Sequence, residues 1–210
     1  TLVRCFSRLH EITGGTIEVD GQDIMSLPEK DLIDLRRSKM GMVFQSFGLL
    51  PHRSVLDNVA FPLEMRGQDK HTRRARALEV IKLVGLEGRE EYFPRELSGG
   101  QQQRVGIARA SALRPDCILA DEIVSGLDVL CHAQVLNLLE SRVKELGLTL
   151  AFISHDLSVI RRLCTRVLVM HQGVIVEVGP TEALFTSPRA EYTRELLNAI
   201  PLPNPYQRWA

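Results

Sequence analysis

The sequence predicts an α/β fold built around a parallel sheet, and three observations support this prediction. Two apolar runs, "CILA" and "LTLAFI", are short enough to be strands, and each is followed by polar residues. The stretch between them predicts a helix with one apolar face, made of Leu136, Leu139, Val143 and Leu146. Fully apolar strands that alternate with helices are typical of a parallel sheet covered on both faces.

The elements before this alternation are predicted in order along the chain. "TLVRCFSRLHEI" predicts a helix, and "GTIEVDGQDI" predicts a hairpin with a turn at Asp20–Gly21. "KMGMVFQ" predicts a strand that ends at Gln45, and several short helices are expected from Ser46 to about Glu96. One of these helices has an apolar face made of Ala77, Val80, Ile81 and Val84.

The elements after the second apolar run are a helix and a hairpin. "LSVIRRLC" predicts the helix, and "RVLVMHQGVIVEVG" predicts two strands around a Gln172–Gly173 turn. No stretch approaches the length of apolar residues that a membrane-spanning helix requires.

Composition and charge exclude several classes of protein. Of the 210 residues, 44% are hydrophobic and 25% are charged, which is typical of a globular protein. Lys plus Arg and Asp plus Glu number 26 each, so no overall field favours nucleic acid. The four cysteines are widely spaced, so they predict neither a metal site nor a disulfide framework.

Polar residues at the ends of the predicted strands form a candidate site, because ligands of parallel sheets gather at the carboxyl ends of the strands. Asp121 can hold Mg²⁺, and Glu122 is suited to act as a general base toward water. His155 can donate a hydrogen bond to a γ-phosphate, and Gln45 can reach the metal or the water. An acidic pair after a strand is also often a helix cap, and a histidine there is often a polar edge residue.

The stretch "RELSGGQQQRVGIARA" places a Ser-Gly-Gly loop directly before a helix. Ser98, Gly99 and Gly100 offer a hydroxyl and free backbone N–H groups at the positive end of the helix dipole, which predicts an anion site. The alternative is a plain turn from loop to helix.

These motifs together resemble those of ATP-binding cassette (ABC) transporter ATPases. "LSGGQ", from Leu97 to Gln101, is similar to the family's signature motif, and "MVFQSF" to its Q-loop. "CILADE" resembles the Walker B strand, "SGLD" the D-loop that ends at Asp128, and "ISHD" the switch histidine.

The resemblance implies a P-loop NTPase (RecA-like) core with an N-terminal antiparallel β part and an inserted helical subdomain. It implies one domain over residues 1–210, incomplete at its N-terminus, with the helical subdomain at about 46–110. ATP and Mg²⁺ would be the ligands, with Asp121 and Gln45 near the metal. Two cassettes would pair head to tail, so that the signature residues Ser98, Gly99, Gly100 and Gln101 act on nucleotide held by the partner. The resemblance also implies that Thr1 and Asp128 bind nucleotide.

The sequence departs from the family pattern in two places. The G-x-x-G-x-G-K-[ST]-T phosphate loop and its strand are absent from these residues, and Thr1 would match the loop's final threonine. We therefore expect a cassette truncated before this loop that is inactive alone. Ile123–Val124 also replaces the usual Pro-Thr, which is expected to loosen the turn that aims Glu122.

The resemblance also predicts partners. The first half resembles ATPases of glycine betaine/proline importers and, less closely, of methionine importers, whereas the second half resembles the oligopeptide/dipeptide class. The expected partners are a second cassette, membrane permease subunits and a solute-binding protein, at the cytoplasmic face of the cell membrane. The alternatives are a soluble ABC-type ATPase and a silent cassette that lends its signature loop to a partner.

Overall fold

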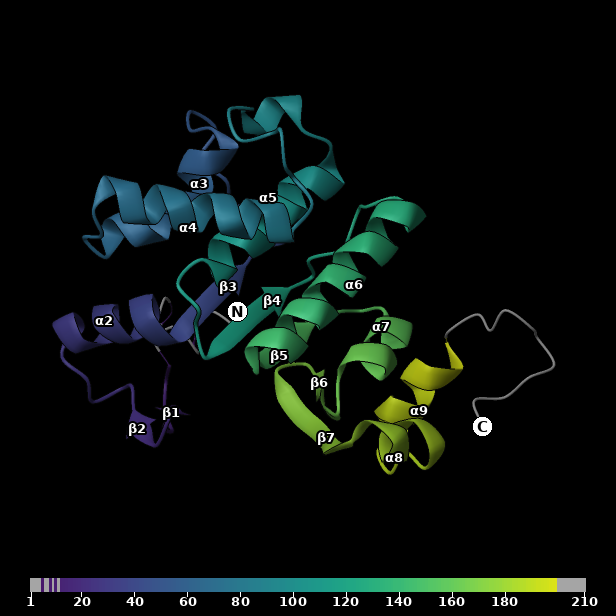
Figure 1. Ribbon diagram of the computed structural model, residues 1–210. Helices are drawn as coiled ribbons and strands as arrows, with labels where there is room; N and C mark the ends of the chain where they lie inside the picture. Colours follow the sequence, from purple (N-terminus) through teal and green to yellow (C-terminus); the bar gives the residue numbers. More distant parts are fainter. Residues whose placement is uncertain (1–4, 6–7, 9, 11, 200–210) are drawn as a thin grey trace. The chain divides into compact units, whose positions relative to one another are not determined.

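The computed structural model describes residues 5, 8, 10 and 12–199 (Figure 1). Thr1 and most of the helix predicted before Gly14 lie outside the described residues. The chain divides into two compact units, one ending at Ile153 and the other beginning at Ser154.

The first described elements are a short hairpin and a helix. β1 (Glu18–Val19) and β2 (Gln22–Asp23) pair antiparallel, which confirms the predicted hairpin. Helix α2 (Glu29–Lys39) was not predicted, although it has acidic residues in its first turn and basic residues in its last. Its buried residues Leu32 and Leu35 pack with Ile24 in a small core.

The centre of the first unit is a parallel sheet in the order β3-β4-β5. Its strands are β3 (Met40–Val43), β4 (Cys117–Asp121) and β5 (Thr149–Ile153). Burial is as predicted for β4, where Ile118 and Ala120 are fully buried. The prediction of a buried strand is wrong for β5, whose residues are half-buried or exposed. The reason is that among the described strands β5 pairs only with β4.

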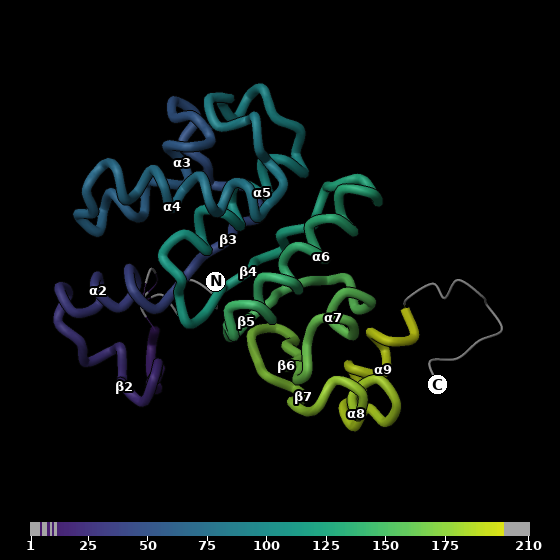
Figure 2. The backbone as a smooth tube through the Cα atoms, viewed as in Figure 1, coloured from purple at the N-terminus to yellow at the C-terminus, as the bar shows by residue number. Residues whose placement is uncertain are grey.

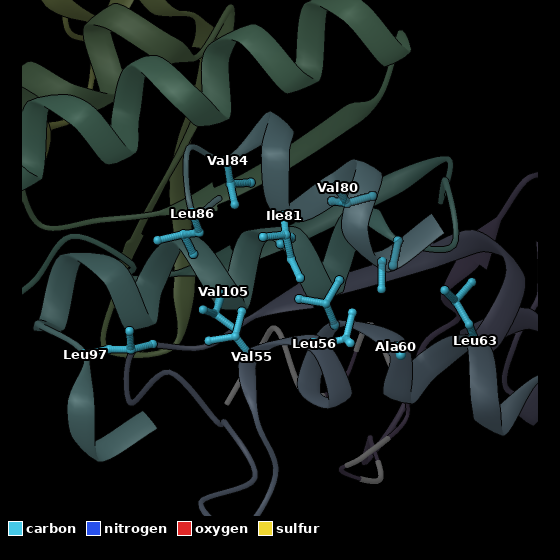
Figure 3. Close-up of a cluster of buried hydrophobic side chains, with 14 residues drawn as sticks. Val55, Leu56, Ala60, Leu63, Val80, Ile81, Val84, Leu86, Leu97 and Val105 are labelled. Carbon is cyan, nitrogen blue, oxygen red and sulfur yellow. The ribbon is translucent and has the colours of Figure 1, made fainter. Parts of the chain in front are cut away.

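Helices α3 (Val55–Met65), α4 (Lys70–Leu83) and α5 (Gly99–Ser111), with the short 3₁₀ helix η1 (Pro94–Glu96), follow β3. Figure 3 shows their shared apolar core, which includes Val55, Leu63, Ile81, Leu86 and Val105. The predicted buried face of α4 is confirmed. α5 also packs against β3, and so connects this helical group to the sheet (Figure 2).

Helix α6 (Val129–Leu146) joins β4 to β5 and buries Leu136 and Leu139 as predicted. The prediction is wrong for Leu146, which is 37% exposed. Gly147 ends the helix in a left-handed conformation, and the amide of Leu148 donates to the Val143 carbonyl. This turn buries Leu148 in place of Leu146.

The second unit contains α7 (Leu157–Leu163), β6 (Arg166–His171), β7 (Val174–Pro180), α8 (Thr181–Thr186) and α9 (Glu191–Asn198). β6 and β7 form the predicted antiparallel hairpin. His171 stacks on Tyr192, with ring centroids 3.9 Å apart, and this contact ties α9 to the hairpin.

Candidate functional site

The carboxyl ends of β3 and β4 bring two predicted site residues together. Gln45 follows the end of β3, and Glu122 directly follows β4. The parallel register places these ends beside each other, and Gln45 Nε2 donates to Glu122 Oε2 at 3.2 Å. The sheet therefore joins an amide and a carboxylate from residues far apart in the sequence.

The backbone at Glu122 is strained. Its φ is +47°, a left-handed conformation that costs a residue with a side chain about 1–2 kcal/mol. The turn is held by hydrogen bonds from the Glu122 amide to the Ile153 carbonyl and from the Ser125 amide to the Glu122 carbonyl. Ile123 and Val124, the residues that depart from the family pattern, are buried and anchor the same turn in the core.

The Ser-Gly-Gly loop begins α5 with a capping box. The Ser98 hydroxyl oxygen accepts from the Gln101 amide at 3.3 Å, and the Gln101 side-chain oxygen accepts from the Ser98 amide at 2.9 Å. Gln101 thus has a structural partner within the loop. The amides of Gly99 and Gly100 lie in the first turn, where backbone N–H groups have no acceptor within the helix.

The two glycines of this loop differ in their surroundings. A Cβ on Gly100 would lie 2.8 Å from Cys131 Sγ and 2.9 Å from Cys131 Cβ, so the first turn of α6 packs directly on this backbone. A Cβ on Gly99 would make ordinary contacts, 3.4 Å from Leu127 and 3.6 Å from Phe47. Packing within the chain is therefore sufficient to require glycine at position 100, whatever approaches the loop from outside.

A turn between Gln45 and α3 was not predicted from the sequence. Phe47 and Gly48 have φ of +59° and +58°. Arg109, on α5, donates to the Gly48 carbonyl at 2.6 Å and to the Phe47 carbonyl at 3.3 Å. Burial lowers the pKa of the Arg109 guanidinium. Gly48 was the available sequence signal, but a lone glycine does not identify the side chain that holds its turn.

The remaining predicted residues lie at element ends. Asp121 is the last residue of β4, and Asp128 is the N-cap of α6, where its carboxylate accepts from the Cys131 amide at 2.9 Å. This hydrogen bond holds the pKa of Asp128 below its usual value. His155 is exposed in the second unit, directly before Asp156, the N-cap of α7.

The donor set at the strand ends fits a sparsely liganded Mg²⁺. No group of three or more His, Cys, Asp or Glu side chains that could hold a metal was found among the described residues. Mg²⁺ commonly takes only one or two carboxylates and completes its shell with water and substrate phosphates. Asp121 supplies a carboxylate, and Gln45, whose nitrogen is engaged by Glu122, has an amide oxygen to offer.

The loop between the turn and α3 is organised by Asn58. This side chain is fully buried, donates to the Leu50, Arg53 and Ser54 carbonyls at 3.0 Å, and accepts from the Leu50 amide at 2.8 Å. Leu49 packs against the helical core and is half-buried.

Comparison with known proteins identifies the class to which this fold and site belong. A model of the ABC transporter family matches residues 1–125, and the chain belongs to that family. The chain also resembles the ATP-binding cassette MJ0796 in two dimeric structures, one of them a post-hydrolysis state bound to ADP and Pi. For each, the TM-score is 0.77 at 34% identity, covering 86% of this chain and 79% of the other. The fold is therefore the P-loop NTPase fold of ABC ATPases, as predicted.

Particular relatives are transport proteins. The chain is 60% identical over 200 residues to the trimethylamine N-oxide transport system ATP-binding protein TmoW of Ruegeria pomeroyi, covering 95% of this chain and 59% of that protein. It is 49% identical over 197 residues to the methionine import ATP-binding protein MetN 2 of Enterococcus faecalis, covering 94% and 57%. The chain thus spans less than two thirds of the length of these relatives. The MetN name agrees with the methionine class that was predicted as the less close resemblance, whereas neither name is that of a glycine betaine or peptide importer.

Proposed function

We propose that this chain is the ATP-binding and ATP-hydrolysing part of an ABC importer for a small solute. The observation that carries the proposal is the Gln45–Glu122 hydrogen bond at the carboxyl ends of two parallel strands. This pair supports the proposal because a carboxylate can deprotonate an attacking water and an amide can orient it beside a phosphate. Membership of the ABC transporter family supports ATP as the substrate.

The chain's own residues have distinct roles in this proposal. Glu122 accepts a proton from the attacking water, and Gln45 orients that water. Asp121, with the Gln45 amide oxygen, would hold Mg²⁺, which supplies charge neutralisation at the phosphates when bound. His155 donates to the γ-phosphate.

Ser98, Gly99, Gly100, Gln101 and Asp128 act in trans. The capped N-terminus of α5 presents amide donors and a positive dipole end to nucleotide held by a second cassette. The dimeric structures of a cassette with 34% identity support a pair of this kind. Thr1, outside the described residues, is proposed to belong to the chain's own nucleotide site.

The transported solute is proposed to be a small methylated amine oxide or an amino acid. This follows the names of the similar TmoW and MetN proteins. The glycine betaine/proline class remains the related alternative for the first half of the sequence.

The proposed partners are permease subunits and a solute-binding protein, with the cassette at the cytoplasmic face of the membrane and no nucleic acid involved. None of the described helices is both long and apolar enough to cross a bilayer. We propose that residues 47–58 contact the permease through the exposed tip at Pro51 and His52, because Asn58 holds this loop in one conformation. Cysteine crosslinking from Pro51→Cys and from His52→Cys to a co-expressed permease tests this, and absence of crosslinks from both positions would count against it.

The test of the central proposal uses a loop-bearing cassette, meaning this chain preceded by the family's phosphate-loop segment. Glu122→Gln should slow ATP hydrolysis about 10²–10⁴-fold and leave ATP binding intact, the usual effect of losing a general base. Glu140→Gln, which removes a half-buried carboxylate paired with the exposed Lys144, is the matched control and should leave turnover unchanged.

Near-normal turnover in the Glu122→Gln variant would remove Glu122 from the mechanism. Absence of hydrolysis in the unmodified loop-bearing cassette, together with stimulation of a partner cassette, would favour the silent-cassette alternative. Hydrolysis without any permease association would favour a soluble ABC-type ATPase.

A further inference from the structure

The turn that follows Gln45 has an unfavourable backbone conformation. Phe47 adopts a left-handed φ of +59°, which costs about 1–2 kcal/mol for a residue with a side chain. A Cβ on Gly48 would lie 2.9 Å from the Phe44 ring, so the turn is also tightly packed. Strained turns persist only where surrounding contacts over-determine them.

The contacts that hold this turn come from α5, the helix that begins at the Ser-Gly-Gly loop. The two Arg109 bonds reach consecutive carbonyls, those of Phe47 and Gly48. A guanidinium is a planar fork of donors, so one side chain can fix two neighbouring acceptors at once. Close packing of α5 reinforces the contact, because a Cβ on Gly106 would lie 3.7 Å from the Phe47 carbonyl oxygen.

The same turn directly follows the residue that reaches Glu122. Gln45 precedes Phe47 by two residues, and its amide donates to the Glu122 carboxylate. A chain of contacts therefore runs from α5 through Arg109, the Phe47–Gly48 turn and Gln45 to Glu122. All of these residues belong to the first unit.

We propose that Arg109 is a positioning residue for hydrolysis, which fixes the Phe47–Gly48 turn so that Gln45 stays beside Glu122. This inference rests on the proposed function, because it uses Glu122 as the base. Helix α5 begins at the Ser-Gly-Gly loop and carries Arg109 in its last turn. It therefore links that loop to the turn after Gln45, so that displacement of α5 displaces Gln45.

The first test is a kinetic comparison in the loop-bearing cassette. Arg109→Met keeps most of the apolar stem and removes both hydrogen bonds, and should lower kcat about 10–100-fold, the effect of a small misplacement. The KM for ATP should change less than kcat, because Gln45 orients the water and is only one of the groups proposed to hold Mg²⁺. Arg109→Lys keeps one donor and should recover part of the loss.

Arg76→Met is the matched control. Arg76 also donates to two consecutive carbonyls, Ser111 at 3.4 Å and Ala112 at 3.1 Å, but these belong to the C-terminal end of α5 and not to the turn after Gln45. Its loss should lower stability and leave kcat within about twofold. An equal fall in kcat for both arginines would overturn the proposal by showing a general effect of destabilisation.

A double-mutant cycle separates positioning from other roles. In the Gln45→Ala background, Arg109→Met should lower kcat by no more than about twofold, because the residue through which it acts is already gone. A full multiplicative loss in the double variant, or no loss in Arg109→Met alone, would overturn the proposal.

A spectroscopic readout distinguishes failure of this inference from failure of the proposed function. In the [¹⁵N]glycine-labelled cassette, Arg109→Met should shift the Gly48 amide signal and leave the remote Gly67 signal in place. An unmoved Gly48 signal overturns the positioning role. A shifted Gly48 signal combined with normal turnover in Glu122→Gln would instead overturn the assignment of the base.

Discussion

The signature loop and the turn after β3 are held in opposite ways. At the signature loop, Ser98 and Gln101 satisfy each other's backbone within four residues, with no strained φ at either residue. At the Phe47–Gly48 turn, two left-handed residues are held by Arg109, which lies far along the chain on another element.

The difference shows how each loop obtains its conformation. A capping box is a local device that forms wherever the helix forms, so the signature loop is set by its own sequence. The turn after β3 keeps its conformation only while α5 is docked against the sheet, because its strained backbone is held by contacts from that helix. Local changes should therefore weaken the two loops in different ways.

The largest expected effect is at the strained turn. Gly48→Ala should lower the free energy of unfolding by about 2–4 kcal/mol, since it adds a left-handed cost and a contact with the Phe44 ring. Gly67→Ala is the control, because Gly67 has a φ of +76° but no atom within 4 Å of the added Cβ. Denaturant unfolding of both variants isolates the contact, and equal losses would show that packing at Gly48 contributes nothing.

The next effect separates the two glycines of the signature loop. Gly100→Ala should cost about 1–3 kcal/mol through its clash with Cys131, whereas Gly99→Ala should change stability by less than about 1 kcal/mol. Adding Cys131→Ala to Gly100→Ala removes the sulfur contact and should recover part of the loss in thermal unfolding. A larger loss at Gly99 would contradict this account of the packing.

Removal of the cap should have a smaller effect. Ser98→Ala removes the acceptor for the Gln101 amide and should lower the free energy of unfolding by about 1 kcal/mol, the usual cost of losing an N-cap. Ser98→Asn keeps an acceptor and should stay close to the parent protein in denaturant unfolding. If the two variants were equally unstable, the capping box would not be what holds this loop.

The smallest expected effect is on how stability falls at low pH, where the Asp128 cap of α6 is lost. The Cys131 amide holds the pKa of Asp128 below its usual value, so the cap of α6 is intact above about pH 4 and is lost as pH falls through the folded value. The Ser98 cap does not titrate in this range. Asp128→Asn should therefore make stability fall less steeply between about pH 5 and pH 3, while Ser98→Asn leaves the slope unchanged. The slopes follow from thermal unfolding at a series of pH values.

The sequence by itself determined the elements whose signals are local. "CILA" and "LTLAFI" became the parallel strands β4 and β5, the Asp20–Gly21 turn became a hairpin, and the Ser-Gly-Gly stretch became a capped helix start. Composition and periodicity predict such features because each depends on residues within a few positions of one another. Helix α2 was missed although its charges and its Leu32–Leu35 spacing were local signals of the same kind.

Only the tertiary structure decided how the candidate site is assembled. The sequence placed Gln45 and Glu122 at strand ends, but their hydrogen bond depends on the parallel register of β3 and β4. It could not show that Arg109 holds the Phe47–Gly48 turn, that Cys131 occupies the space beside Gly100, or that Leu148 is buried in place of Leu146. Each of these facts depends on the docking of one element against another, and docking depends on the shape and burial of whole surfaces rather than on the pattern within any one segment.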